Sequence, residues 1–95
     1  MPKTHSGFFK LLSARSRVEI LMLLRQHTNL TVDDLATRLG LSVPTVSRHL
    51  QLLRMQELVT FRQDAQTRFY KVNEEEIGSR MAAFMKDLDL SLPVG

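Results

Sequence analysis

Apolar side chains recur at helical spacing over much of the first 56 residues. The apolar and basic run Phe8–Leu12 predicts a short first helix, and residues 13–17 are typical of a break before a second periodic segment. In that segment the apolar side chains extend around a wide face: Val18, Ile20, Leu21, Met22, Leu23 and Leu24. We therefore expect this second helix to be buried on most of its sides.

A second pair of helices, joined by a very short turn, is predicted between residues 31 and 56. Thr31 with Asp34 three residues later resembles a capping box, which begins a helix. Gly40 stands where a helix ends in a left-handed residue, and Ser42 is placed to cap the next helix, which we expect to run to about Gln56. The inward stripe of that helix is predicted to consist of Val46, Leu50 and Leu53.

After Glu57 the spacing changes from helical to alternating, which is typical of strands. Two alternating runs within about residues 59–72, separated by the polar residues 63–67, predict a β-hairpin. Residues 74–88 return to helical spacing, with acidic residues in the first turn and one apolar stripe: Ile77, Met81, Phe84, Met85 and Leu88. The predicted fold class is mainly α with a small β-hairpin, a winged helix-turn-helix of about five helices and a two-stranded wing.

Three positions in the predicted helix pair have the spacing that a helix-turn-helix requires. Ala36, four residues before Gly40, supplies a small side chain where the two helices cross, and Val46 supplies an apolar side chain behind the second helix. In proteins that bind DNA through this unit, the second helix enters the major groove. The candidate DNA-binding residues of the helix and the hairpin are Ser42, Pro44, Thr45, Ser47, Arg48, His49, Gln51, Arg62, Gln66 and Arg68.

Two interpretations remain open for several of these residues. The guanidinium of Arg48 suits a two-pronged contact to guanine, and it also suits a solvated position or a phosphate contact. Ser42, Thr45 and Ser47 suit phosphates or base edges, although Ser42 caps its helix in either case. His49 flanks the buried stripe, where packing or a phosphate contact is favoured over metal binding.

The composition narrows the classes of function. A chain of 95 residues with 43% hydrophobic residues is expected to fold as a single domain, residues 1–95, with about residues 8–88 as its ordered core. The sequence has no cysteine, which excludes disulfides and thiolate metal sites. No two histidines have metal-ligand spacing on one helix face, and no nucleophile or phosphate-binding motif is present. We therefore expect no metal, no cofactor and no enzymatic activity.

The charge distribution and the apolar runs bear on partners and location. Residues 1–72 hold 11 Lys and Arg against 5 Asp and Glu, whereas residues 73–95 hold 2 against 5. A basic body favours a polyanionic partner such as double-stranded DNA, although a solvated surface also reaches this charge. The longest apolar run, Ile20–Leu24, is far too short to span a membrane, and the first residues lack the features of a secretory signal, so a cytoplasmic protein without membrane contact is expected.

The two end helices carry more apolar side chains than a small winged core can cover. These residues are predicted to form a homodimer interface: Phe8, Phe9, Leu12, Ile77, Met81, Phe84, Met85 and Leu88. The alternative is that they complete the core of a monomer. Met81 and Met85 could also line an inducer pocket, although core packing is the simpler interpretation.

Three stretches of the sequence resemble the ArsR/SmtB family of winged helix repressors: FFKLLSARSRVEILMLL, LTVDDLATRLGLSVPTVSRHLQLLRMQELV and FRQDAQTRFYKV. The resemblance covers about residues 8–88, and the run Leu41–Leu50 is its most distinctive part. It implies a homodimer, assembled through the first and last helices, that represses a promoter until an inducer loosens it. The cysteine pair and the last-helix histidine with which many members sense metals are absent here, and Ala14-Arg15 replaces the common Asp-Pro.

Two functions from different classes follow from the sequence. The first is a sequence-specific, homodimeric transcriptional repressor that binds a palindromic operator through the helix at about 42–56 and the wing at about 59–72. The second is a winged helix that serves as a protein-interaction module without specific DNA binding. The first function is favoured by four arginines, because interaction modules often lack basic residues on the second helix of this unit: Arg48, Arg54, Arg62 and Arg68. The inducer is left open.

Overall fold

Five helices and one antiparallel hairpin follow one another along residues 4–90, the part of the chain that the computed structural model describes. Residues 1–3 and 91–95, which fall within the domain expected over residues 1–95, lie outside the described residues. The elements in chain order are α1 (His5–Leu12), α2 (Arg15–Gln26), α3 (Val32–Leu39), α4 (Val43–Met55), β1 (Val59–Asp64), β2 (Thr67–Val72) and α5 (Glu74–Asp87). The predicted fold class is confirmed.

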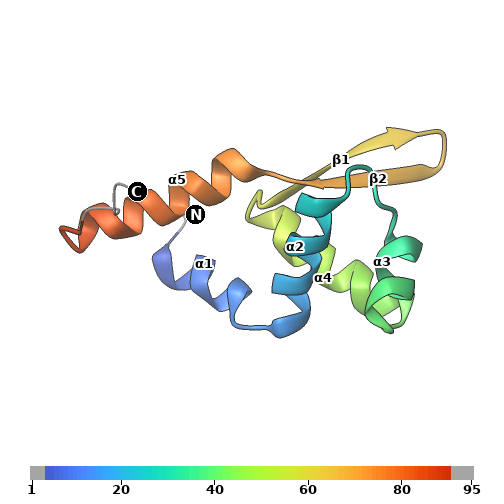
Figure 1. Cartoon of the computed structure of the whole chain (residues 1–95), viewed down its shortest axis with the longest axis horizontal. Coiled ribbons are helices and arrows are strands. Elements are labelled where there is room, and N and C mark those ends of the chain that lie inside the picture. The colour runs from blue at the N-terminus through green and yellow to red at the C-terminus, as the bar shows by residue number, and fades with distance from the viewer. Residues whose placement is uncertain (1–3, 91–95) are drawn as a thin grey trace.

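The elements are arranged in an elongated molecule of 44 × 30 × 25 Å. Helices α2, α3 and α4 form the body, and the β1–β2 hairpin extends away from it on one side (Figure 1). Helices α1 and α5 lie together at the opposite end of the long axis (Figure 1). The hairpin and the α1–α5 pair therefore point in opposite directions from the body.

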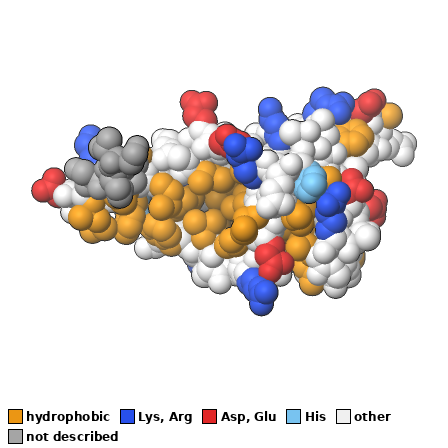
Figure 2. Space-filling model, viewed as in Figure 1, with side chains coloured by type: hydrophobic (Ala, Val, Ile, Leu, Met, Phe, Trp, Pro, Cys, Tyr) orange, Lys and Arg blue, Asp and Glu red, His pale blue; other side chains and the backbone are white. Residues whose placement is uncertain are grey.

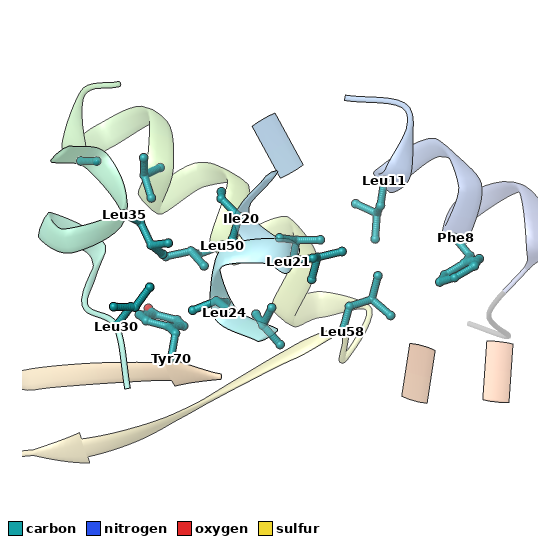
Figure 3. Packing of buried hydrophobic residues seen from close by; sticks show 14 residues of the cluster. Phe8, Leu11, Ile20, Leu21, Leu24, Leu30, Leu35, Leu50, Leu58 and Tyr70 are labelled. Atoms are coloured by element: carbon teal, nitrogen blue, oxygen red, sulfur yellow. The ribbon is translucent and has the colours of Figure 1, made fainter. Parts of the chain in front are cut away.

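The hydrophobic core lies where α2, α3 and α4 meet the base of the hairpin (Figure 3). Val46, Leu50 and Leu53 are at most 1% exposed, which confirms the inward stripe expected for α4. Ile20 and Leu35 meet this stripe from the two neighbouring helices and are fully buried. Because these helices each present one apolar side to a common centre, burial of that side fixes how they pack.

Helix α2 is less buried than its sequence indicated. Only Ile20, Leu21 and Leu24 are buried, whereas Met22 is 56% exposed and Val18 is half-buried. The expectation that this helix is buried on most sides was therefore wrong. Helix α2 packs against α1, α3, α4 and β2. An apolar groove of about 680 Å³ lies between α2 and the start of α5, and Met22 lines it.

The break between α1 and α2 is shorter than predicted. Helix α1 ends at Leu12 and α2 begins at Arg15, so only residues 13 and 14 separate them. The Nε of Arg17 donates a hydrogen bond to the Leu11 carbonyl oxygen at 2.8 Å, and Nη2 donates to that of Lys10 at 3.3 Å. These bonds satisfy carbonyl groups that the end of a helix leaves without partners, which stabilises a sharp turn there.

The hairpin is attached to the body through a short bridge that the sequence pattern did not indicate. The two strands pair in register from Val59 opposite Val72 to Asp64 opposite Thr67. Leu30, in the loop before α3, pairs with Tyr70, whose backbone N–H donates to the Leu30 carbonyl oxygen at 2.8 Å. This contact adds a third strand-like segment at the base of the hairpin and fixes the hairpin beside α3.

Candidate nucleic-acid interface

The turn between α3 and α4 is built from local hydrogen bonds. The predicted capping box is present: Asp34 N–H donates to Thr31 Oγ1 at 3.1 Å, and Thr31 N–H donates to Asp34 Oδ2 at 3.0 Å. Hydrogen bonds from the Thr31 backbone N–H and from its side chain lower the pKa of the Asp34 carboxyl. Gly40 ends α3 with φ of +67°, a left-handed conformation that favours glycine. Ser42 Oγ then accepts a hydrogen bond from Thr45 N–H at 3.3 Å and caps α4.

Helix α4 presents a continuous polar face to solvent. The predicted residues on this face are all exposed: Ser42, Pro44, Thr45, Ser47, Arg48 and Gln51. Val46 and Leu50, on the opposite side of the same helix, are buried in the core. The core therefore holds α4 by one side and leaves the other side exposed to solvent.

His49 differs from the other predicted residues of α4 because it is half-buried. Arg17 Nη1 lies 3.4 Å from its Nδ1 and donates to it. Burial lowers the pKa of His49, and the guanidinium groups of Arg17 and Arg48 lower it further. Through Arg17, His49 joins α4 to the junction between α1 and α2.

The hairpin lies beside the polar face of α4 and adds cationic side chains to it. Arg62, Gln66 and Arg68, the three predicted hairpin residues, are exposed. Gln66 and Arg68 line a groove of about 320 Å³ together with Ser47 of α4. Arg62 is close to a carboxylate, because its Nη1 lies 4.0 Å from Asp64 Oδ2. The fold thus brings two of the three hairpin residues next to α4.

The sequence pattern did not single out Arg54 and Phe61 as a unit at this interface. The guanidinium carbon of Arg54 lies 5.0 Å from the centroid of the Phe61 ring, and that of Arg68 lies 4.3 Å from it. One signal was present in the sequence: Arg54 follows Ser47 by seven residues, two helical turns, and therefore shares its face of α4. The contact with Phe61 depends on the tertiary fold.

At the other end of the molecule, α1 and α5 carry a broad apolar surface (Figure 2). Met81 and Leu88 are 38% and 52% exposed, and none of the apolar residues of α5 is buried. The half-buried members of the predicted interface are Phe9, Leu12, Ile77, Phe84 and Met85. Phe8 requires a correction: it is 0% exposed within the protomer, so it has no surface left for a partner.

A charged side chain of α5 packs against the buried Phe8 ring. Arg80, which the sequence reading passed over, is only 9% exposed and lies over the Phe8 ring, 5.1 Å from its centroid. Its Nη2 donates to the Thr4 carbonyl oxygen at 3.2 Å and to Gln56 Oε1 at 3.3 Å. Arg80 therefore ties α1 and α5 to the end of α4. The sequence held one signal for this role: Arg80 follows Ile77 by three residues and therefore lies at the edge of the apolar stripe.

Residues 4–90 hold neither a metal-binding cluster nor a membrane-spanning helix. No group of three or more His, Cys, Asp or Glu side chains in this range is placed to hold a metal ion. None of the helices in the same range has the length and apolar character needed to cross a bilayer.

The fold is that of a winged helix-turn-helix protein, because α3 and α4 are joined by a glycine turn and an antiparallel hairpin follows beside α4. Residues 15–60 match the family model described as "Bacterial regulatory protein, arsR family". The chain is 40% identical to the arsenical resistance operon repressor of Staphylococcus xylosus, over 77% of this chain and 69% of that protein. The chain therefore belongs to the ArsR family.

Other relatives agree with this placement. The chain is 38% identical to the HTH-type transcriptional regulator KmtR of Mycobacterium tuberculosis over 69 residues, which are 73% of this chain and 52% of KmtR. The crystal structure of NolR from Sinorhizobium fredii is similar at 31% identity with a TM-score of 0.71, covering 90% of this chain and 85% of that chain. The chain thus spans only about half the length of KmtR.

Proposed function

We propose that this chain is a homodimeric, sequence-specific DNA-binding repressor of transcription, and not an enzyme. The observation that carries the proposal is the exposed polar face of α4, held outward by Val46 and Leu50 in the core. A major groove about 12 Å wide admits one helix with short or reaching polar side chains. Ser47, Arg48 and Gln51 on this face have that character.

The hairpin supplies the contacts that hold such a helix in place. Arg68 and Gln66 lie across a groove from Ser47, where the backbone of a bound duplex would pass. Each phosphate that a cation neutralises releases counterions, so these contacts supply affinity without reading sequence. Arg48 has no ion pair within the described residues, and its planar guanidinium is free for a two-pronged contact to guanine.

The apolar face of α1 and α5 supports the dimer. A 14-residue helix whose apolar stripe stays partly exposed in the protomer is stabilised when a second copy covers that stripe. In the proposed dimer the two copies of α4 enter successive major grooves, about 34 Å apart on a palindromic operator. The interface comprises the partly exposed residues of the predicted set: Phe9, Leu12, Ile77, Met81, Phe84, Met85 and Leu88.

DNA binding is tested by selecting genomic fragments that the protein retains and then titrating a selected duplex by fluorescence anisotropy. Arg48→Ala should weaken binding to the selected duplex by about 1 to 3 kcal/mol and relax the sequence preference. Arg68→Ala should weaken all duplexes alike and reduce the salt slope by about one. Lys86→Ala, which removes one positive charge in the last turn of α5, is the control.

The same titration distinguishes the two functions that the sequence left open. A folded wild-type protein without salt-sensitive DNA binding would contradict the proposal and favour a protein-interaction module. If Arg48→Ala binds the selected duplex as tightly as wild type, the base-reading role of Arg48 is refuted. The proposed DNA-binding function of the protein would still stand.

The dimer is tested by light scattering. The double substitution Met81→Glu and Leu88→Glu should give a protein of protomer mass, because it places charges in the proposed apolar interface. Met55→Glu is the control, since Met55 is 69% exposed in the last turn of α4 and is not among the residues proposed for the interface. A wild-type protein of protomer mass at micromolar concentration would rule out the dimer.

A further inference from the structure

The ring of Phe61 is contacted by two arginines from different elements. Arg54, in the last turn of α4, places its guanidinium carbon 5.0 Å from the ring centroid. Arg68, on β2, places its guanidinium carbon 4.3 Å from the same centroid. Phe61 itself is half-buried on β1 and rests against Tyr70, with 5.7 Å between the ring centroids. The ring therefore joins the reading helix to both strands of the hairpin.

The register of the hairpin explains why Arg68 reaches this ring. Phe61 pairs with Tyr70 across the two strands, and Arg68 is two residues before Tyr70. Paired residues and residues two apart point to the same face of a hairpin, so Phe61 and Arg68 share the face that Tyr70 buries. Arg68 also lines the groove that Ser47 of α4 borders. The two arginines thus stand at the junction of α4 and the hairpin.

Neither of these two arginines is paired with an acid in the part of the chain that the structure describes. Within residues 4–90, Arg54 and Arg68 have no carboxylate oxygen within 4.0 Å, whereas Arg25 is paired with Glu74 at 2.7 Å. An aromatic ring holds a guanidinium through its face and takes up none of its five N–H donors. The charge and the donors of both arginines therefore remain available for an anion.

We propose that Phe61 is a positioning residue that holds Arg54 and Arg68 ready to clamp phosphates of one DNA strand where α4 meets the hairpin. The proposal rests on the DNA binding proposed above and adds a role for a residue that does not itself contact DNA. A long side chain loses rotamer freedom when it binds, and this loss weakens binding. Two arginines already ordered against one ring lose less of that freedom on binding.

The first test replaces the ring and measures affinity for a selected duplex. Phe61→Leu should weaken binding about five- to tenfold, and Phe61→Tyr, which keeps the aromatic face, should stay within about twofold of wild type. The salt slope should not change in Phe61→Leu, because both charges remain, whereas Arg68→Gln should reduce it by about one. An equal loss in Phe61→Tyr and Phe61→Leu would overturn the proposal.

A double-mutant cycle separates positioning from a structural effect. In a background with Arg54→Gln and Arg68→Gln, Phe61→Leu should have no further effect on affinity, because nothing is left for the ring to order. The same loss in this background as in the wild-type background would overturn the proposal. Phe69→Leu, a change of the same kind at the ring that Arg62 covers at 4.8 Å, is the matched control and should keep the coupling between Phe61 and its two arginines intact.

A measurement on the free wild-type protein does not depend on whether the variants fold. Nuclear spin relaxation of the arginine Nε–H groups should show more restricted motion for Arg54 and Arg68 than for Arg48, which has no such ring contact. Equal mobility of all three would overturn the pre-ordering. A wild-type protein that binds no DNA refutes the proposed function itself, whereas DNA binding that Phe61→Leu leaves unchanged refutes only the role of Phe61.

Discussion

Gly40, at the turn that sets the angle between α3 and α4, offers a sharp test of the fold. Its φ is +67° and its ψ is +32°, and a Cβ added there would meet no atom within 4 Å beyond its own chain neighbours and local helix backbone. The cost of Gly40→Ala therefore comes from the left-handed backbone alone, about 1 to 2 kcal/mol for a residue with a Cβ. Asn tolerates this conformation better than Ala, so Gly40→Asn should lose less stability.

The assay is thermal unfolding of the three proteins at one fixed protomer concentration, because dimerisation would make the midpoint depend on concentration. For a domain of this size, a loss of 1 kcal/mol lowers the midpoint by roughly 4 to 8 °C. Gly40→Ala should thus unfold several degrees below wild type, with Gly40→Asn between them. An Ala variant as stable as wild type would refute the reasoning, since nothing else at this position opposes a side chain.

Further predictions concern the core, a helix cap and a histidine. Leu50→Ala should cost about 2 to 5 kcal/mol in denaturant unfolding, because Leu50 is 1% exposed at the centre of the core. Thr31→Ala should cost about 1 kcal/mol in the same assay, since it removes the bond that Asp34 N–H donates. Folding lowers the pKa of His49, so the unfolded chain binds a proton more readily than the folded protein as the pH is lowered. The free energy of unfolding should therefore be highest above pH 6.5 and should fall as the pH drops below that value. His49→Gln should reduce this fall in pH-dependent denaturant titrations, and an unchanged pH profile would show that His49 does not contribute to it.

The helix-turn-helix could be predicted from the sequence because its signals are local. Thr31, Gly40 and Ser42 each act within four residues of their own position, so a short segment carries all the information needed to place the turn. The inward stripe of α4 was equally accessible, since helical spacing alone separates Val46 and Leu50 from the polar face.

The sequence predictions that were wrong or incomplete all depend on contacts between distant segments of the chain. Spacing showed that α2 is apolar over a wide face, but not that Met22 faces a groove rather than a neighbouring helix. In the same way, Phe8 was expected at an interface because the end helices carry more apolar side chains than a small core can cover, whereas Arg80, 72 positions later, packs over it in the fold. A periodic pattern records which side of an element is apolar and says nothing about what lies opposite.

By itself, the sequence determined the order of the elements, the turn at Gly40 and the outward face of α4, because hydrogen bonds and helical spacing within a few residues specify them. Only the tertiary structure decided which cations meet at the hairpin. Arg54 and Arg68 are 14 positions apart, and they reach the same ring because packing of the core places the end of α4 beside the hairpin.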